Sequence, residues 1–190
     1  MKKFVLSFLA LFIVIGLSAQ KHFGIKAGLN FDNAKEIKWS SETIDKSTGW
    51  HAGFLLLAKL PLGFAFQPEL LYSVKKYGKR EHKFELSYIE LPLNFQWGID
   101  LLLLRPFVMA SPYISYLAKV GGHATEWNKE KKLNNLDYGF GLGFGLDLWK
   151  LQVTAKYNWG LGKLGNIKTD KWELNDSSLK NFQLSLGILF

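Results

Sequence analysis

Two glutamates, Glu69 and Glu90, are the residues of this chain best placed for chemistry. Each lies at a matching point in one of two successive stretches that alternate apolar and polar residues. Successive side chains of a strand point to opposite faces, and the parity of both stretches puts the two carboxylates on the polar face. Paired carboxylates support glycoside hydrolysis when a substrate can enter between them. The surrounding residues predict no such cleft, so we interpret the pair as structural.

Basic residues of the same parity are available to neutralise the two glutamates. They lie on the polar side of other alternating stretches. A charge buried in a narrow, low-dielectric space must be paired, because an isolated buried ion is very costly. We therefore predict an internal charge network that fixes strand register, with Arg105 as a further contributor; a gate or a proton-sensitive plug is the alternative. The predicted members are Lys26, Glu69, Lys75, Glu90 and Lys156.

Nucleophiles and metal ligands are sparse in this sequence. The chain has no cysteine, which excludes thiol and disulfide chemistry. Its four histidines show none of the spacings typical of metal ligands, and His51 is expected to point inward at a strand end. A membrane-embedded serine hydrolase needs a lipid-facing serine beside a histidine, and Ser87 and Ser111 qualify by position only. We predict no catalytic residue, no metal and no cofactor, and a protein that is not an enzyme.

The N-terminus has the three parts of a secretory signal. Residues 1–3 (MKK) are basic at the start, residues 4–17 are apolar, and residues 18–20 (SAQ) offer a small residue at the cleavage point. So short an apolar segment does not span a bilayer comfortably, which disfavours an N-terminal anchor. We predict a signal peptide over 1–19 and one domain over 20–190. The two lysines that are removed lower the net charge from +8 to +6.

Eight stretches of this domain alternate apolar and polar residues with the period of two that is typical of a strand. Short links follow the second, fourth and sixth stretches, whereas long polar segments follow the first, third, fifth and seventh. Short turns at one end and long loops at the other are typical of bacterial outer-membrane barrels. The eight expected strands are 23–31, 50–60, 64–76, 84–97, 105–117, 137–148, 151–160 and 179–190.

The fold class that follows is an all-β, eight-stranded, antiparallel up-and-down transmembrane β-barrel. In lipid, strands satisfy every backbone amide only when they close into a barrel. The rival is a soluble, ligand-binding barrel of the lipocalin type, which has its apolar face inside. The polar face of this chain mixes charged residues with the alternate glycines of 137–148. That composition suits a narrow interior better than an exterior, so we predict the membrane barrel.

The C-terminal stretch ends on an aromatic residue, Phe190, and resembles the terminal strand of outer-membrane barrels, where a final Phe is the usual assembly signal. Further stretches resemble the PorT-like outer-membrane β-barrel protein family, most specifically QPELLYS (67–73) followed by YIELPL (88–93). The resemblance implies an integral protein of the outer membrane of a Gram-negative cell. One branch of that family takes part in a protein secretion and gliding machinery. The other matching stretches include FGIKAGLNF (23–31), RPFVMASPYISYL (105–117) and DYGFGLGFGLDL (137–148).

Two of the long loops carry features that suit binding. Clustered lysine and arginine in the second loop are suited to the phosphates of lipopolysaccharide, with ordinary solvated charge as the alternative. Trp39 in the first loop is a candidate anchor for a protein partner, or a cap on the barrel mouth. Nucleic acid is not an expected partner outside the cell. The candidate lipopolysaccharide contacts are Lys76, Lys79, Arg80 and Lys83.

These features favour a non-enzymatic outer-membrane protein that serves as a structural or accessory envelope component. Its outer loops are expected to bind a protein partner, with secretion as one candidate role, or lipopolysaccharide. The first alternative is a small ion-conducting pore, although the interior of an eight-stranded barrel is filled by side chains. A membrane-embedded hydrolase is the weakest alternative, because the sequence shows no catalytic constellation.

Overall fold

The computed structural model describes residues 20–33, 37–39, 42–43, 47–77, 84–122, 136–161, 167–169, 172–174 and 180–190. The predicted signal peptide lies outside these residues. Within the described part of the chain, no helix has the length and apolar character needed to cross a membrane.

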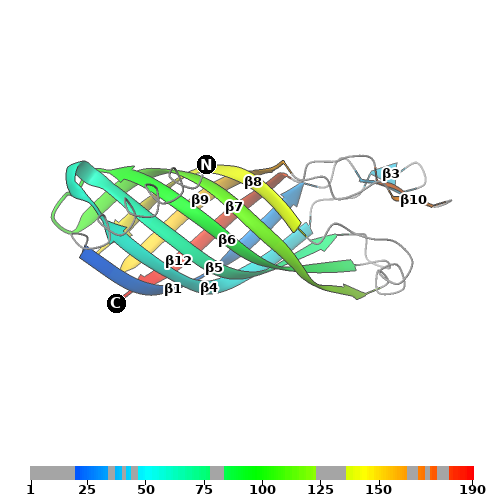
Figure 1. Ribbon diagram of the computed structural model, residues 1–190, viewed down its shortest axis with the longest axis horizontal. Coiled ribbons are helices and arrows are strands. Elements are labelled where there is room, and N and C mark those ends of the chain that lie inside the picture. Colours follow the sequence, from blue (N-terminus) through cyan, green and yellow to red (C-terminus); the bar gives the residue numbers. More distant parts are fainter. Residues whose placement is uncertain are drawn as a thin grey trace, which may run out of the picture.

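Eight strands close into an antiparallel barrel (Figure 1). Each wall strand pairs with the wall strands that precede and follow it in the sequence. The first and last strands, β1 and β12, pair with each other and close the barrel. All eight predicted strands are present, and the predicted fold class is confirmed. The strands are β1 (Gln20–Asn33), β4 (Ser47–Lys59), β5 (Phe64–Tyr77), β6 (Phe84–Gly98), β7 (Leu104–Gly122), β8 (Leu136–Leu148), β9 (Leu151–Gly160) and β12 (Lys180–Leu189).

The two faces of the wall have opposite polarity. Along β12, Asn181, Gln183 and Ser185 are buried, whereas the alternate residues Phe182 and Leu184 are exposed. The other strands follow the same rule, so polar side chains fill the lumen and apolar side chains cover the outside. A soluble ligand-binding barrel has the reverse arrangement. The lipocalin-like alternative is therefore wrong for this chain.

The glycines of β8 make room for aromatic side chains that point inward from β7. A Cβ atom at Gly145 would come within 2.4 Å of the Phe107 ring, and one at Gly139 within 2.5 Å of the Tyr113 hydroxyl. Phe107 and Tyr113 are both buried. The glycine face of 137–148 thus lines a crowded interior, as its composition predicts.

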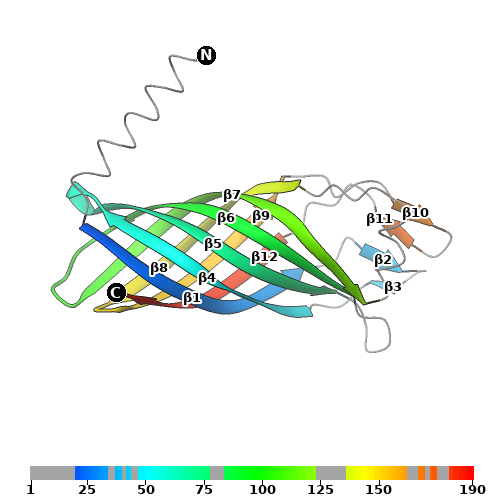
Figure 2. The same ribbon diagram turned by 60° about the horizontal axis from the view of Figure 1, so that its bottom comes forward.

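The two ends of the barrel differ in the length of their connections (Figures 1 and 2). At one end, which we call the turn end, lie the short connections after β4, β6 and β8, together with the C-terminus. The connection after β4 is a 3₁₀ turn, η1 (Pro61–Gly63). The long connections lie at the opposite end, which we call the loop end.

The first and last long connections contain four short strands that the sequence does not predict. They are β2 (Ile37–Trp39), β3 (Glu42–Thr43), β10 (Ile167–Thr169) and β11 (Trp172–Leu174). These strands form a second sheet in the order β10-β11-β2-β3, beyond the loop end of the barrel (Figure 2). Runs of two or three residues are too short for an alternating pattern to stand out, which explains why we expected only polar loops there.

A small apolar cluster lies inside the barrel near the turn end. Leu55, Leu57, Ala65 and Leu189 form a buried cluster inside the barrel, and none of them is more than 5% exposed. They come from β4, β5 and β12, close to the ends of these strands. Most of the polar interior lies between this cluster and the loop end, and Arg105 and Asp147 are buried at the turn end beside the cluster.

Candidate functional site

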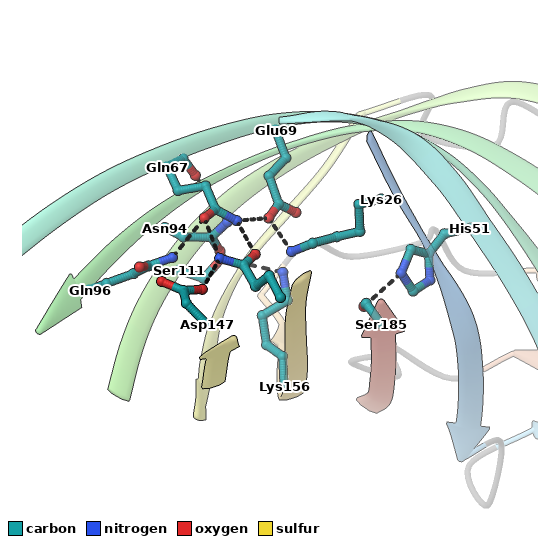
Figure 3. Close-up of polar contacts among 11 residues, drawn as sticks. Lys26, His51, Gln67, Glu69, Asn94, Gln96, Ser111, Asp147, Lys156 and Ser185 are labelled. Carbon is teal, nitrogen blue, oxygen red and sulfur yellow. Dashed lines mark hydrogen bonds and ion pairs between the residues drawn. The ribbon is translucent and has the colours of Figure 1, made fainter. Parts of the chain in front are cut away.

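All five members of the predicted charge network lie buried inside the barrel. Lys26 of β1 forms an ion pair and a hydrogen bond with Glu69 of β5 (Figure 3). Lys75 of β5 lies with its Nζ 3.1 Å from Oε1 of Glu90 on β6. Each glutamate thus has its own lysine, and the two pairs occupy different levels of the lumen.

Lys156 of β9 is the fifth member of the network. Its Nζ lies 3.5 Å from the hydroxyl oxygen of Ser111 on β7 (Figure 3). Both Glu69 and Glu90 interact electrostatically with it. This lysine therefore adds positive charge between the two ion pairs without a carboxylate in direct contact.

Arg105 has a different partner from the one expected. It lies on β7 at the turn end, where its guanidinium group is 3.2 Å from Asp147 on β8. It also donates hydrogen bonds to Gln96 (3.0 Å) and to the backbone carbonyl of Gly63 in the η1 turn (3.0 Å). Arg105 therefore ties the short turn after β4 to the wall instead of neutralising Glu69 or Glu90.

Uncharged amides connect the ion pairs, and sequence analysis missed them. Gln67 and Gln152 donate to each other in a reciprocal pair, at 2.9 Å in each direction. Gln67 also donates to Glu69 at 2.6 Å, and Gln152 donates to Asp147 at 2.8 Å. Gln96 donates to Gln67 at 2.9 Å (Figure 3). A continuous chain of hydrogen bonds therefore runs from Arg105 through these amides to the Lys26–Glu69 pair.

The buried charges of the described residues balance. Their number is four on each side. A low-dielectric lumen requires this neutrality, because each uncompensated ion would leave a large desolvation cost. The basic residues are Lys26, Lys75, Arg105 and Lys156, and the acidic residues are Glu69, Glu90, Asp137 and Asp147.

His51 joins three adjacent strands at the seam where the barrel closes. From β4, its Nδ1 lies 2.8 Å from Oδ1 of Asn30 on β1, and its Nε2 lies 2.9 Å from Oγ of Ser185 on β12 (Figure 3 shows the contact with Ser185). The ring crosses Gly28 of β1, where a Cβ atom would come within 2.7 Å of it. The expectation that His51 points inward agrees with this geometry, but sequence analysis did not identify its partners.

The hydrogen bonds of Asn30 fix the roles of both ring nitrogens. Its amide nitrogen donates to the carbonyl of Trp50 at 3.2 Å and to the hydroxyl of Ser73 at 2.8 Å, so its oxygen faces His51. An amide oxygen only accepts, which requires a proton on Nδ1 of the imidazole. In the neutral ring Nε2 then accepts from the Ser185 hydroxyl.

This order of groups is that of a serine nucleophile with its base and orienting residue, but its surroundings are those of a packed interior. Asn30 and His51 are at most 1% exposed, and Ser185 is 7% exposed. A cavity described inside the barrel has room for about one water molecule, which is too little for an acyl substrate. It is lined by Lys75, Glu90, Pro92, Tyr113, Lys156, Asn158 and Gln183. We interpret the Ser185–His51–Asn30 chain as a clamp across the seam.

The other residues considered for catalysis or metal binding do not assemble a site. Ser87 and Ser111 are buried in the wall, so neither is the lipid-facing serine that an embedded hydrolase would need. No group of three or more histidine or carboxylate side chains within the described ranges is arranged to hold a metal ion.

Most of the predicted binding residues of the loops lie outside the described residues. This holds for Lys79, Arg80 and Lys83. Lys76 lies on β5 opposite Glu85, and Trp39 lies on β2 opposite Trp172, but the structure describes only their backbone. Their roles therefore stay predictions.

Comparison with known proteins supports the barrel fold. A family model described as an outer membrane protein beta-barrel domain matches residues 18–166. The chain is similar in structure to the outer membrane enzyme PagL (10% identity, TM-score 0.52, 87% of this chain and 98% of PagL covered). It is also similar to OprG from Pseudomonas aeruginosa (9% identity, TM-score 0.52, coverage 90% and 97%). For neisserial surface protein A the identity is 13% and the TM-score 0.49, with coverage of 88% and 97%. No curated protein matches the chain.

Proposed function

Since the chain belongs to the family of outer membrane protein beta-barrel domains, we propose that it is a non-enzymatic accessory or structural component of the envelope. It is an integral outer-membrane protein, and in such barrels the short turns face the periplasm and the long loops face outward. The loop end then binds another envelope component, and the barrel holds that binding surface at the membrane.

The second sheet carries this proposal. It joins the first long connection to the last, because β2 pairs with β11 across more than half of the chain. The register sets Trp39 opposite Trp172 and Ile37 opposite Leu174, whereas Lys38 is opposite Glu173. Positions two apart share a face of a strand, so in β2 and β11 the apolar positions lie on one face and the charged positions on the other. In β3, Glu42 is opposite Trp39 and adds a carboxylate at the edge of the apolar face. Such a sheet, held beyond the barrel, suits a surface for a protein partner in which aromatic residues act as anchors.

The filled lumen argues against the pore and the hydrolase. Its side chains form balanced ion pairs and continuous hydrogen bonds, and the apolar cluster around Leu55 and Leu57 lies near the turn end. The cavity that the structure describes in the lumen has room for about one water molecule. The structural likeness to PagL concerns the fold, and one fold hosts many activities.

The finer family assignment belongs to the same proposal. The stretches QPELLYS (67–73) and YIELPL (88–93) resemble PorT-like proteins, which supports an accessory role in protein secretion. In the barrel these stretches lie on the paired strands β5 and β6 and include Glu69 and Glu90.

Photo-cross-linking in intact cells tests the proposed partner surface. A photoreactive amino acid at position 39 should give one dominant protein adduct, and the Trp172→Ala change should weaken it at least several-fold. The control is the same amino acid at position 142, where the native leucine faces lipid and is 48% exposed. If position 39 gave adducts with lipopolysaccharide alone, the partner would be a lipid and not a protein. Identical adducts from positions 39 and 142 would contradict a specific binding surface.

Lipopolysaccharide binding by the second long loop is tested by charge reversal. Changing Lys79, Arg80 and Lys83 to glutamate should lower the amount of lipopolysaccharide that copurifies, because lysine and arginine hold phosphate groups. The matched control reverses three lysines at the turn end. Equal loss in both variants would show a general charge effect instead of a site. The control residues are Lys21, Lys59 and Lys150.

A further inference from the structure

Each of the three connections at the turn end presents a large apolar side chain at its tip. Leu62 is 87% exposed, Leu102 is fully exposed and Trp149 is 79% exposed. These residues do not belong to the lumen network, and they lie at the end of the molecule opposite the second sheet.

The backbone at these tips makes the choice of residue unusual. Leu62, Leu102 and Trp149 have φ angles of 62°, 42° and 53°, and they are the only described residues other than glycine in the left-handed region. Glycine and asparagine adopt this conformation more easily than bulky residues do. A large apolar side chain in water adds a second unfavourable contribution at each tip. An apolar medium removes the second contribution, and the favourable transfer of the side chains into it offsets the cost of the backbone conformation.

The tips of neighbouring turns form one continuous edge. The backbone N–H of Trp149 donates to the carbonyl of Leu103 at 2.9 Å, which joins the turn after β8 to the turn after β6. Leu101 and Leu103 are also exposed, at 52% and 74%. We define the apolar edge as these turn residues: Ile99, Leu101, Leu102, Leu103 and Trp149, together with Leu62 on the third turn.

The lipid-facing surface of β7 leads directly into this edge, which contains one exposed carboxylate, Asp100. Between Tyr116 and Leu104, every outward residue of β7 is apolar. Ten residues of a tilted strand rise by about 25 Å, which is the height of the apolar band of such barrels. The span from Tyr138 to Leu148 on β8 has this length, so Trp149 falls at the boundary. The apolar outward residues of β7 extend further than those of β8, down to Leu104, so the turn that carries Leu102 begins where this apolar surface ends.

The few charges near the edge have partners of their own. Asp100 lies 3.6 Å from Lys59 and 3.7 Å from Arg105. The Nζ of Lys150 lies over the Trp149 ring, 5.5 Å from its centre. A tryptophan with a neighbouring lysine is typical of the membrane–water interface.

We propose that the apolar edge inserts into the phospholipid of the periplasmic leaflet, at the boundary between head groups and acyl chains, and sets the depth of the barrel. The occupant is lipid because the edge is continuous with the lipid-facing wall. The turns of this barrel are then immersed in the interface instead of projecting into the periplasm.

The absence of native cysteine allows a direct test with single labels. An environment-sensitive fluorophore on Leu102→Cys is measured in phosphatidylethanolamine–phosphatidylglycerol vesicles with nitroxides near the top of the acyl chains. We expect blue-shifted emission and strong quenching, close to those of a label on Val108→Cys, which faces lipid at 56% exposure. A label on Lys119→Cys near the loop end provides the aqueous reference. If the label at position 102 matched this aqueous reference in emission and quenching, the proposal would be overturned. The apolar edge would then be a candidate surface for a protein partner.

A second variant separates the side chains from the backbone. Asparagine at positions 62, 102 and 149 keeps the left-handed conformation but removes the apolar groups. A label on Leu104→Cys should then become at least several-fold more accessible to aqueous iodide. Unchanged accessibility in a correctly folded variant would also overturn the proposal.

Discussion

Ion pairs inside the lumen and at the rim differ in their surroundings. The side chains of Lys26 and Glu69 are 4% and 1% exposed, whereas those of Lys59 and Asp100 are 31% and 62% exposed. Removing one partner of a buried pair leaves an uncompensated charge in a low-dielectric medium. An exposed ion is solvated by water when its partner is removed, so an exposed pair contributes little.

The Glu69→Ala variant should lose about 3–5 kcal/mol of unfolding free energy, because Lys26 stays buried without its carboxylate. Urea unfolding of the protein in lipid vesicles, followed by tryptophan fluorescence, measures the change. The control Lys59→Ala should cost about 1 kcal/mol or less. Equal midpoints for Glu69→Ala and the parent protein would exclude a stabilising role for the pair.

The seam between β1 and β12 should tolerate added volume at one glycine and not at another. At Gly28 a Cβ atom would come within 2.2 Å of the Leu184 carbonyl oxygen and 2.7 Å of the His51 ring. At Gly187 the nearest atoms lie at 3.4 to 3.6 Å, which is ordinary contact. Gly28→Ala should therefore lower the unfolding free energy by about 1–3 kcal/mol, and Gly187→Ala by clearly less. Heat-modifiable migration in gels verifies that both variants fold, and their urea midpoints measure the two losses. Equal midpoints for Gly28→Ala and Gly187→Ala would refute this prediction.

The sequence predicted five of the charged residues that face the lumen, because strand parity follows directly from an alternating pattern, but Asp137 and Asp147 were not in the predicted network. It did not predict the pairing of Arg105 with Asp147 or the contact between His51 and Ser185. The latter residues are 134 positions apart, and only the closed wall brings them together. Gln67, Gln96 and Gln152 escaped notice because an inward amide looks like any other polar residue in such a pattern.

At the level of elements, the barrel wall and the second sheet have separate hydrogen-bond ladders. The wall strands pair only with one another, and β2, β3, β10 and β11 pair only among themselves. The long alternating stretches were sufficient to predict the wall. Pairing between β2 and β11 joins short segments far apart in the chain, and no local pattern predicts it.

Replacing residues 162–178 with a short glycine-rich turn should therefore leave the barrel intact. The wall keeps all its ladders in this variant, whereas β2 loses its partner β11. We expect a urea midpoint within error of the parent protein and loss of the partner adduct at position 39. A large drop in the midpoint would show that the second sheet stabilises the barrel.

The whole molecule is a closed, filled cylinder with a neutral interior. Eight strands leave a lumen that side chains fill, and here they do so with paired charges, amides and an apolar cluster. The cavity described in this interior has room for about one water molecule.

The folded protein should therefore show no single-channel current above background in a planar bilayer. Heat-modifiable migration of the same preparation verifies that the inserted protein is folded. Reproducible current steps that scale with salt concentration would contradict the filled lumen and favour the pore.

The pairing of the first and last strands has a consequence for the order of folding. Gly24 of β1 lies opposite Leu189 of β12, and the N–H of Phe190 donates to the carbonyl of Phe23 at 2.7 Å. These contacts span nearly the whole domain, so the entropy of ring closure must be overcome before they form. Until β12 arrives, β1 and β9 each present an unpaired edge on which another chain can assemble. Closing the ring therefore carries the largest loop-closure entropy of the wall contacts, and two edges of the sheet stay open until it occurs.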